Sequence, residues 1–208
     1  MAAELAEFPP PGLTRTKLLV ALAAQAVVMI GLGLGLWQLA GRPLPAFLTF
    51  SLGELASGIA LGAGLSMVAF ALWRAFPATG EKLIRLQAGT YATLMPHVSW
   101  PVIVAVSLCA GFGEEALFRA GLQTFLGDYV GVPAAILLSS AAFAAIHFGK
   151  PVITALIFVI GCLFGAIYWQ TGSLLIVAVG HAVYDVWALR YLHREVVRLG
   201  LANAPAPG

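Results

Sequence analysis

Long runs of apolar residues are the feature that most limits what this chain can fold into. Six such runs occupy residues 18–40, 55–76, 98–125, 132–148, 152–169 and 174–192. A bilayer core is crossed by about 20 helical residues, so each run is a candidate transmembrane helix, although the fourth and fifth are short. Only 10% of the 208 residues are charged, whereas a soluble domain carries about 25%. The sequence therefore predicts an all-α, polytopic membrane helix bundle of about six transmembrane helices.

The chain length suits one membrane-embedded domain, which we place at residues 18–195. Residues 1–17 would form a cytoplasmic N-terminal tail, and residues 196–208, which end in an Ala/Pro-rich stretch, a disordered C-terminal tail. The first apolar run is too long for the core of a cleaved signal peptide, so we expect it to remain as a helix. The segment 81–95 mixes basic and apolar residues, which fits either an interfacial amphipathic helix or a polar loop.

Basic residues are distributed unevenly between the two predicted sides of the membrane. With the N-terminus inside, the external segments hold only Arg42. The cytoplasmic segments hold Arg15, Lys17, Arg74, Lys82, Arg85, Lys150, Arg190, Arg194 and Arg198. This bias predicts an even number of crossings with both termini cytoplasmic. The Ala/Gly-rich composition is typical of bacteria, so we expect the bacterial inner (cytoplasmic) membrane. The basic residues are scattered, so no nucleic-acid partner is expected.

Ionisable side chains occur inside three of the apolar runs. The third run contains Glu114, Glu115 and Arg119, and a charged group at the bilayer centre costs at least ~2.5–3.5 kcal/mol, so such residues are usually functional. On a helix, Glu115 and Arg119 share a face and can pair, whereas Glu114 points about 100° away, free to face a cavity. A structural ion pair between helices would explain Glu115 and Arg119 but not Glu114.

The fourth and sixth runs each add a pair of residues one helical turn apart. These pairs are Phe143 with His147, and His181 with Asp185. Either histidine alone could serve a local hydrogen bond, but ionisable groups on three separate helices favour one shared polar site.

The expected depths of these groups do not match. Glu114 and His181 lie somewhat outward of mid-membrane by our boundaries, whereas His147 lies near the cytoplasmic end of its run. The groups can meet only if the turn at residues 149–151 is sunk into the protein.

The three patterns resemble the motifs of the CAAX-protease and bacteriocin-processing family of intramembrane glutamic endopeptidases. They are E-E-x-x-x-R at residues 114–119, F-x-x-x-H at residues 143–147 and H-x-x-x-D at residues 181–185, and the resemblance covers residues 113–185. Two positions depart from the commoner pattern. Ala120 follows the arginine where glycine is frequent, and Asp185 stands where asparagine is frequent.

The resemblance implies a role for each motif residue. Glu114 would be the general base that activates a water, with His147 as its partner. His181 and Asp185 would stabilise the oxyanion. The remaining motif residues would be supporting ones. Glu115 and Arg119 would orient the helix, and Phe143 would be a further supporting residue. No metal and no cofactor are implied.

The same residue types suit peptide hydrolysis on chemical grounds. Amide hydrolysis needs a nucleophilic water, and a carboxylate in a low-dielectric cavity can act as its general base. Negative charge then develops on the carbonyl oxygen and is best met by preorganised donors such as a histidine N–H. Water must reach the site, so we expect the helices to enclose a hydrated cavity.

The sequence thus predicts an intramembrane endopeptidase that cleaves a membrane-associated peptide or protein in a C-terminal or leader segment. Its expected partners are that substrate and the lipid bilayer. One alternative is a zinc-dependent membrane protease that uses His147, His181 and one glutamate, because two histidines and a carboxylate form a plausible zinc set. A second alternative is a non-catalytic membrane binding or immunity protein on the same scaffold. A third, an ion-coupled transporter, is disfavoured because the sequence shows no paired repeat halves or broken helices.

Overall fold

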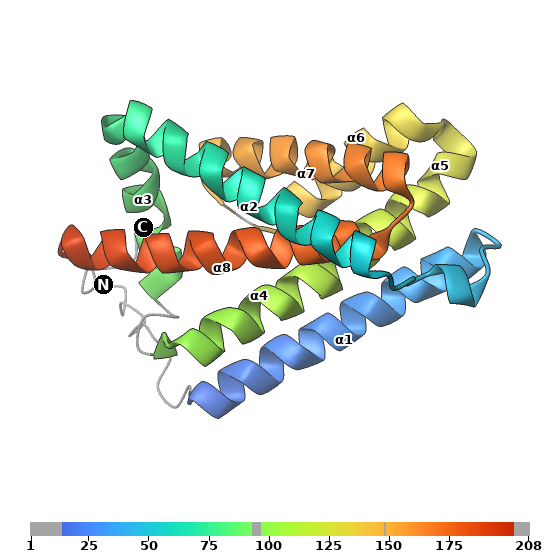
Figure 1. Ribbon diagram of the computed structural model, residues 1–208, viewed down its shortest axis with the longest axis horizontal. Helices are drawn as coiled ribbons and strands as arrows, with labels where there is room; N and C mark the ends of the chain where they lie inside the picture. Colours follow the sequence, from blue (N-terminus) through green and yellow to red (C-terminus); the bar gives the residue numbers. More distant parts are fainter. Residues whose placement is uncertain (1–13, 93–96, 148, 202–208) are drawn as a thin grey trace, which may run out of the picture.

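The structure is a computed structural model that describes residues 14–92, 97–147 and 149–201, and long helices form its bundle (Figure 1). The elements in chain order are α1 (Arg15–Leu39), the short 3₁₀ helix η1 (Leu44–Ala46), α2 (Leu52–Ala75), α3 (Pro77–Ala92), α4 (Trp100–Glu115), the π-helix η3 (Ala116–Gln123), α5 (Thr124–Val130), α6 (Val132–Ala145), α7 (Pro151–Thr171) and α8 (Leu174–Arg198). The predicted all-α membrane bundle is confirmed.

Five helices in the described part of the chain are long and apolar enough to cross a membrane. They are α1, α2, the continuous helix Trp100–Val130, α7 and α8. The fourth predicted run forms α6, which has 14 residues and is about 21 Å long, short of the ~30 Å hydrocarbon core. The fifth run forms α7, which is longer than predicted at 21 residues. The count of six becomes five full-length helices and one short one.

The predicted domain ends differ from the helix ends by a few residues. Helix α1 begins at Arg15, inside the predicted N-terminal tail, and α8 continues to Arg198, beyond the predicted domain end at residue 195. Residues 1–13 and 202–208, which make up most of the two predicted tails, lie outside the described residues.

Residues 81–95, for which the sequence allowed either an amphipathic helix or a polar loop, lie mostly in helix α3. Its apolar face buries Ile84, Ala88 and Tyr91 in a cluster with Val196 of α8. Its opposite face carries an exposed ion pair between Arg85 Nη2 and Glu81 Oε1 at 2.8 Å. Helix α3 runs across the ends of α2 and α8 rather than along them (Figure 1). This agrees with the amphipathic-helix alternative over most of the segment; residues 93–95 lie outside the described part.

Glycines bring two pairs of helices into backbone contact, α1 with η3 and α2 with α8. A Cβ at Gly33 of α1 would collide with the carbonyl oxygen of Ala116, and a Cβ at Gly121 would lie 2.7 Å from the Cα of Gly33. On the other side, a Cβ at Gly62 of α2 would lie 2.5 Å from the carbonyl oxygen of Gly180 in α8. These close approaches are those that small residues permit between membrane helices.

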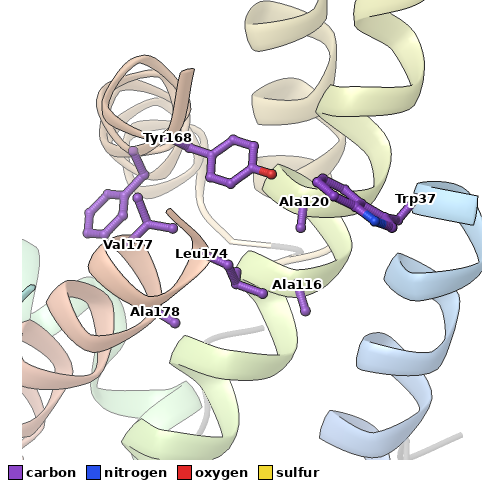
Figure 2. Close-up of a cluster of buried hydrophobic side chains, with 8 residues drawn as sticks. Trp37, Ala116, Ala120, Tyr168, Leu174, Val177 and Ala178 are labelled. Carbon is purple, nitrogen blue, oxygen red and sulfur yellow. The ribbon is translucent and has the colours of Figure 1, made fainter. Parts of the chain in front are cut away.

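A cluster of buried side chains fills the space where these helices meet. Figure 2 shows Ala116 and Ala120 of η3 between Trp37 of α1 and residues of α7 and α8, including Tyr168 and Leu174. The small alanine side chains let the larger side chains pack against the helix that carries them. The acidic segment is therefore held on both sides by packed neighbours.

Helices α6 and α7 form an antiparallel hairpin of unequal arms. A Cβ at Gly165 would lie 3.1 Å from Ile136, and a Cβ at Gly161 would lie 3.1 Å from Ser140, which fixes their alignment. Since α7 is about 31 Å long and α6 about 21 Å, α6 ends before it reaches the level at which α7 begins. His147 lies two residues beyond the end of α6 and is exposed, as are residues 149–151. The expectation of a turn sunk into the protein is therefore wrong, and it is the short length of α6 that lets His147 reach the cavity.

The alternation of helix ends predicts opposite sides for two exposed loops. The beginnings of α1, α4 and α7 lie at the same end of the bundle as the ends of α2 and α8 (Figure 1). In a background with Cys109 and Cys162 replaced by serine, Tyr129→Cys and Lys150→Cys should label with a membrane-impermeant thiol reagent from opposite faces of the membrane.

Lys82→Cys on the exposed face of α3 is the matched control and should label from the same face as Lys150→Cys. Labelling of Tyr129→Cys and Lys150→Cys from one face would contradict this topology.

Candidate active site

The acidic segment changes its helical geometry within the membrane-spanning helix Trp100–Val130. Helix α4 ends at Glu115, and the next eight residues form the π-helix η3. π-Turns inside α-helices are uncommon and occur frequently at functional sites. At the end of η3, the Gln123 side-chain amide donates to the carbonyl oxygen of Gly165 in α7 at 2.9 Å, which ties this segment to the hairpin. No residue pattern indicated this change, because residues 114–119 also fit an α-helix.

Glu115 is the most fully engaged carboxylate of the site. Its Oε2 lies 3.2 Å from Arg119 Nε, and both side chains are only 1% exposed. Its Oε1 accepts a hydrogen bond from His181 Nδ1 of α8 at 2.9 Å. The pairing of Glu115 with Arg119 agrees with the sequence expectation. The bond to His181 was not expected, and it makes Glu115 the link between the acidic helix and α8.

The other ring nitrogen of His181 faces two further carboxylates. Its Nε2 lies 3.8 Å from Glu114 Oε2 and 3.5 Å from Asp185 Oδ2. An ionised carboxylate can only accept hydrogen bonds, so His181 Nδ1 carries a proton and donates it to Glu115. The position of Nε2, between Glu114 and Asp185, is thereby fixed by the Glu115 bond. Glu114 and His181 are each 13% exposed, so both remain accessible.

His147 approaches the same space from the end of α6. Its Nδ1 donates to the carbonyl oxygen of Phe143 at 2.8 Å, which leaves Nε2 as the acceptor nitrogen of a neutral imidazole. The hydrogen bonds and ion pairs of the described residues include no direct one between His147 and Glu114. Both side chains line the same cavity but do not bond to each other directly.

One cavity of about 390 Å³ brings all the predicted site residues together. Its walls include Glu114, Glu115, Arg119, Phe143, His147, His181 and Asp185. These residues come from α4, η3, α6 and α8, so three segments separated in the sequence form one polar centre in a largely apolar bundle. The arrangement offers carboxylate and imidazole groups to a molecule that enters the cavity.

The rest of the cavity is apolar and was missed by the sequence analysis. A row of aromatic rings extends along α8 from Tyr184, with ring centroids 6.1 Å apart for Tyr184 and Trp187 and 5.3 Å apart for Trp187 and Tyr191. Trp73 of α2 packs on Tyr191 at 5.2 Å. The only signal in the sequence is the aromatic spacing on the last run, which also fits ordinary packing.

Phe164 of α7 is a second residue that the sequence did not indicate. Its ring lies 5.6 Å from the His181 ring, and its side chain is 2% exposed. It thus forms an apolar wall beside an ionisable group. No His, Cys, Asp or Glu side chains within the described ranges form a group of three that could hold a metal ion.

Comparison with known proteins found a family match for the segment of the chain that contains the polar residues of this cavity. Residues 96–187 match the model of a family described as type II CAAX prenyl endopeptidase Rce1-like. A stretch of 103 residues is 32% identical to an uncharacterized protein, YpbD, of Bacillus subtilis (strain 168), and covers 48% of this chain. The chain spans about half the length of this curated relative, at 50%. No solved structure gave a significant match.

The matched segment contains all seven motif residues, so the family resemblance inferred from the motifs is confirmed.

The engagement of both Glu115 oxygens predicts that this residue stabilises the fold. Glu115→Gln keeps the shape but leaves the buried Arg119 charge without a charged partner, a change that typically costs ~3–5 kcal/mol. We expect a clear fall in the thermal unfolding temperature of the detergent-solubilised protein. The matched control is Glu114→Gln, whose carboxylate is more exposed and lies 3.8 Å from its ion-pair partner. Unfolding of Glu115→Gln at the wild-type temperature would contradict the assignment.

Proposed function

We propose that this protein is a membrane endopeptidase. Residues 96–187 match the model of the Rce1-like endopeptidase family, and the motif residues within this segment line one cavity. It hydrolyses a peptide bond of a membrane-associated peptide or protein with a water activated by Glu114. The observation that carries the proposal is the meeting of Glu114, His147, His181 and Asp185 in a cavity that also has a large apolar part.

Glu114 is the proposed general base. Its carboxylate lines the cavity without a hydrogen-bonded partner as close as that of Glu115, so it is available to a water molecule. His147 supports the same role, because its Nδ1 is bonded to Phe143 and its Nε2 is left to accept a hydrogen bond from that water. As the water oxygen attacks the carbonyl carbon of the substrate, Glu114 takes its proton.

His181 is the proposed donor to the oxyanion. When both its ring nitrogens carry protons, Nδ1 donates to Glu115 and Nε2 donates into the cavity. Asp185 lies 3.5 Å from Nε2, which supports a role in orienting His181, since a carboxylate itself would repel an oxyanion. A preorganised donor of this kind stabilises the charge that develops in the transition state. The carbon–nitrogen bond then breaks as Glu114 returns the proton to the leaving amine.

The apolar part of the cavity supports a peptide substrate that carries large apolar groups. Leu156, Ile157 and Ile160 of α7 face the same cavity as Trp187 and Tyr191 of α8. Burial of such groups next to the reacting bond provides binding energy at roughly 25 cal/mol per Å² of apolar surface. We therefore infer that the substrate is held beside α7 and α8 while its scissile bond lies near Glu114.

The proposed base predicts a loss of turnover without a loss of fold. Glu114→Gln should lower cleavage of a membrane-anchored reporter peptide by at least about 10²-fold, the lower end of the range for general acid–base catalysis. The protein should still purify as a folded species. Glu81→Gln on the exposed face of α3 is the control and should cleave at the wild-type rate. Normal turnover by Glu114→Gln would favour the non-catalytic binding alternative.

Direct water activation also predicts independence from metal ions. Prolonged dialysis against a chelator should leave the cleavage rate unchanged, and elemental analysis of active protein should find no stoichiometric zinc. A metal-bound water would behave oppositely, because its acidity depends on the ion. The control is a zinc protease treated in parallel. Loss of activity on chelation with recovery on addition of zinc would establish the metalloprotease alternative.

A further inference from the structure

Phe143 belongs to one of the motifs, but the proposed chemistry gives it no role. Its side chain, on α6, is 5% exposed and lines the cavity together with the polar residues. An apolar side chain at this place could simply fill space. Its contacts indicate a more specific role.

The two sides of Phe143 contact different parts of the polar centre. The guanidinium carbon of Arg119 lies over the Phe143 ring, 4.9 Å from its centroid. The ring of His147 meets Phe143 edge to face at 4.7 Å, while the Phe143 carbonyl oxygen accepts from His147 Nδ1. Phe143 therefore holds His147 with its backbone and its ring, and holds Arg119 with its ring face.

Phe143 is connected to His181 in two ways: its ring meets the His181 ring edge to face at 6.3 Å, and a series of neighbours joins the two histidines. His181 bonds to Glu115 at 2.9 Å, and Glu115 pairs with Arg119 at 3.2 Å. Arg119 stacks on Phe143, which meets His147. The series joins α8, the acidic helix and α6, each of which supplies one motif. No other described residue contacts both Arg119 and His147 in this way among the ring and cation–π contacts.

We propose that Phe143 is a positioning residue that, together with Arg119, fixes the relative orientation of His147 and His181. This inference rests on the proposed endopeptidase function. An aromatic ring is required because its negatively polarised face attracts a buried cation, an attraction that an aliphatic side chain of similar size does not provide. Gly161 of α7 keeps the ring in place, since a Cβ there would lie 3.3 Å from Phe143 Cδ1.

The first test compares two buried phenylalanines. Phe118 packs against Phe143 at 5.3 Å and is 4% exposed, but it has no ring contact with either histidine. Phe143→Leu should lower kcat by about tenfold with little change in KM, the size expected for loss of a desolvated cation–π contact. Phe118→Leu should lose comparable thermal stability with a much smaller fall in kcat. Equal falls in kcat for the two variants would overturn the proposal.

A second test leaves every motif residue in place. Gly161→Ala presses on Ser140, 3.1 Å from the added Cβ, and on the Phe143 ring at 3.3 Å. Gly31→Ala on α1 meets no atom within 4 Å and serves as its control. We expect kcat to fall several-fold in Gly161→Ala alone, with KM unchanged. If Phe143→Leu does not fold, this pair decides the question, and equal rates for the two alanine variants would overturn the proposal.

A double-mutant cycle shows whether Phe143 acts through Arg119. The kcat losses of Phe143→Leu and Arg119→Lys should combine to less than their product, because the two residues are in contact. Multiplication of the two losses would count against the coupling. If these tests fail but Glu114→Gln is inactive, only the role of Phe143 is contradicted and the proposed function is still supported. If Glu114→Gln is active, the proposed function itself is contradicted.

Discussion

The buried carboxylate of Glu115 is the group on which the rest of the site depends. Transfer of a charge from water into a protein interior is costly unless that charge is paired and hydrogen-bonded. Glu115 meets this requirement with Arg119 on one oxygen and His181 on the other. Because each partner lies on a different part of the bundle, the energy that keeps Glu115 buried also fixes where α8 lies relative to the acidic helix.

The helices can satisfy Glu115 only because their backbones approach closely. Gly33 and Gly121 permit the contact between α1 and η3, and Gly62 permits that between α2 and α8. The π-helix carries Arg119, which lies 3.2 Å from Glu115, while its small residues Ala116 and Gly121 lie against Gly33 of α1. Packing and electrostatics therefore act at the same place, and neither would define the geometry without the other.

Much of this arrangement could be predicted from local patterns. Apolar run length identified most of the spanning helices, and the four-residue spacing of Glu115 and Arg119 predicted their pairing. The π-helix could not be predicted, because Ala116 to Gln123 have no residue that excludes an α-helix. The bond from His181 to Glu115 rather than Glu114 depends on how α8 packs against α4. The short length of α6 depends on where residues after Ala145 leave the helix, which hydropathy does not show.

The helices that position the site lie partly outside the segment that matches the family model. Residues 96–187 match that model, but α1 and α2, whose glycines contact η3 and α8, precede it. A larger side chain at Gly33 or Gly62 would push these helices away from η3 and α8. Such a change would displace the polar residues of the cavity without altering any residue of the matched segment. That segment is therefore a smaller piece than the structure that holds its polar residues in place.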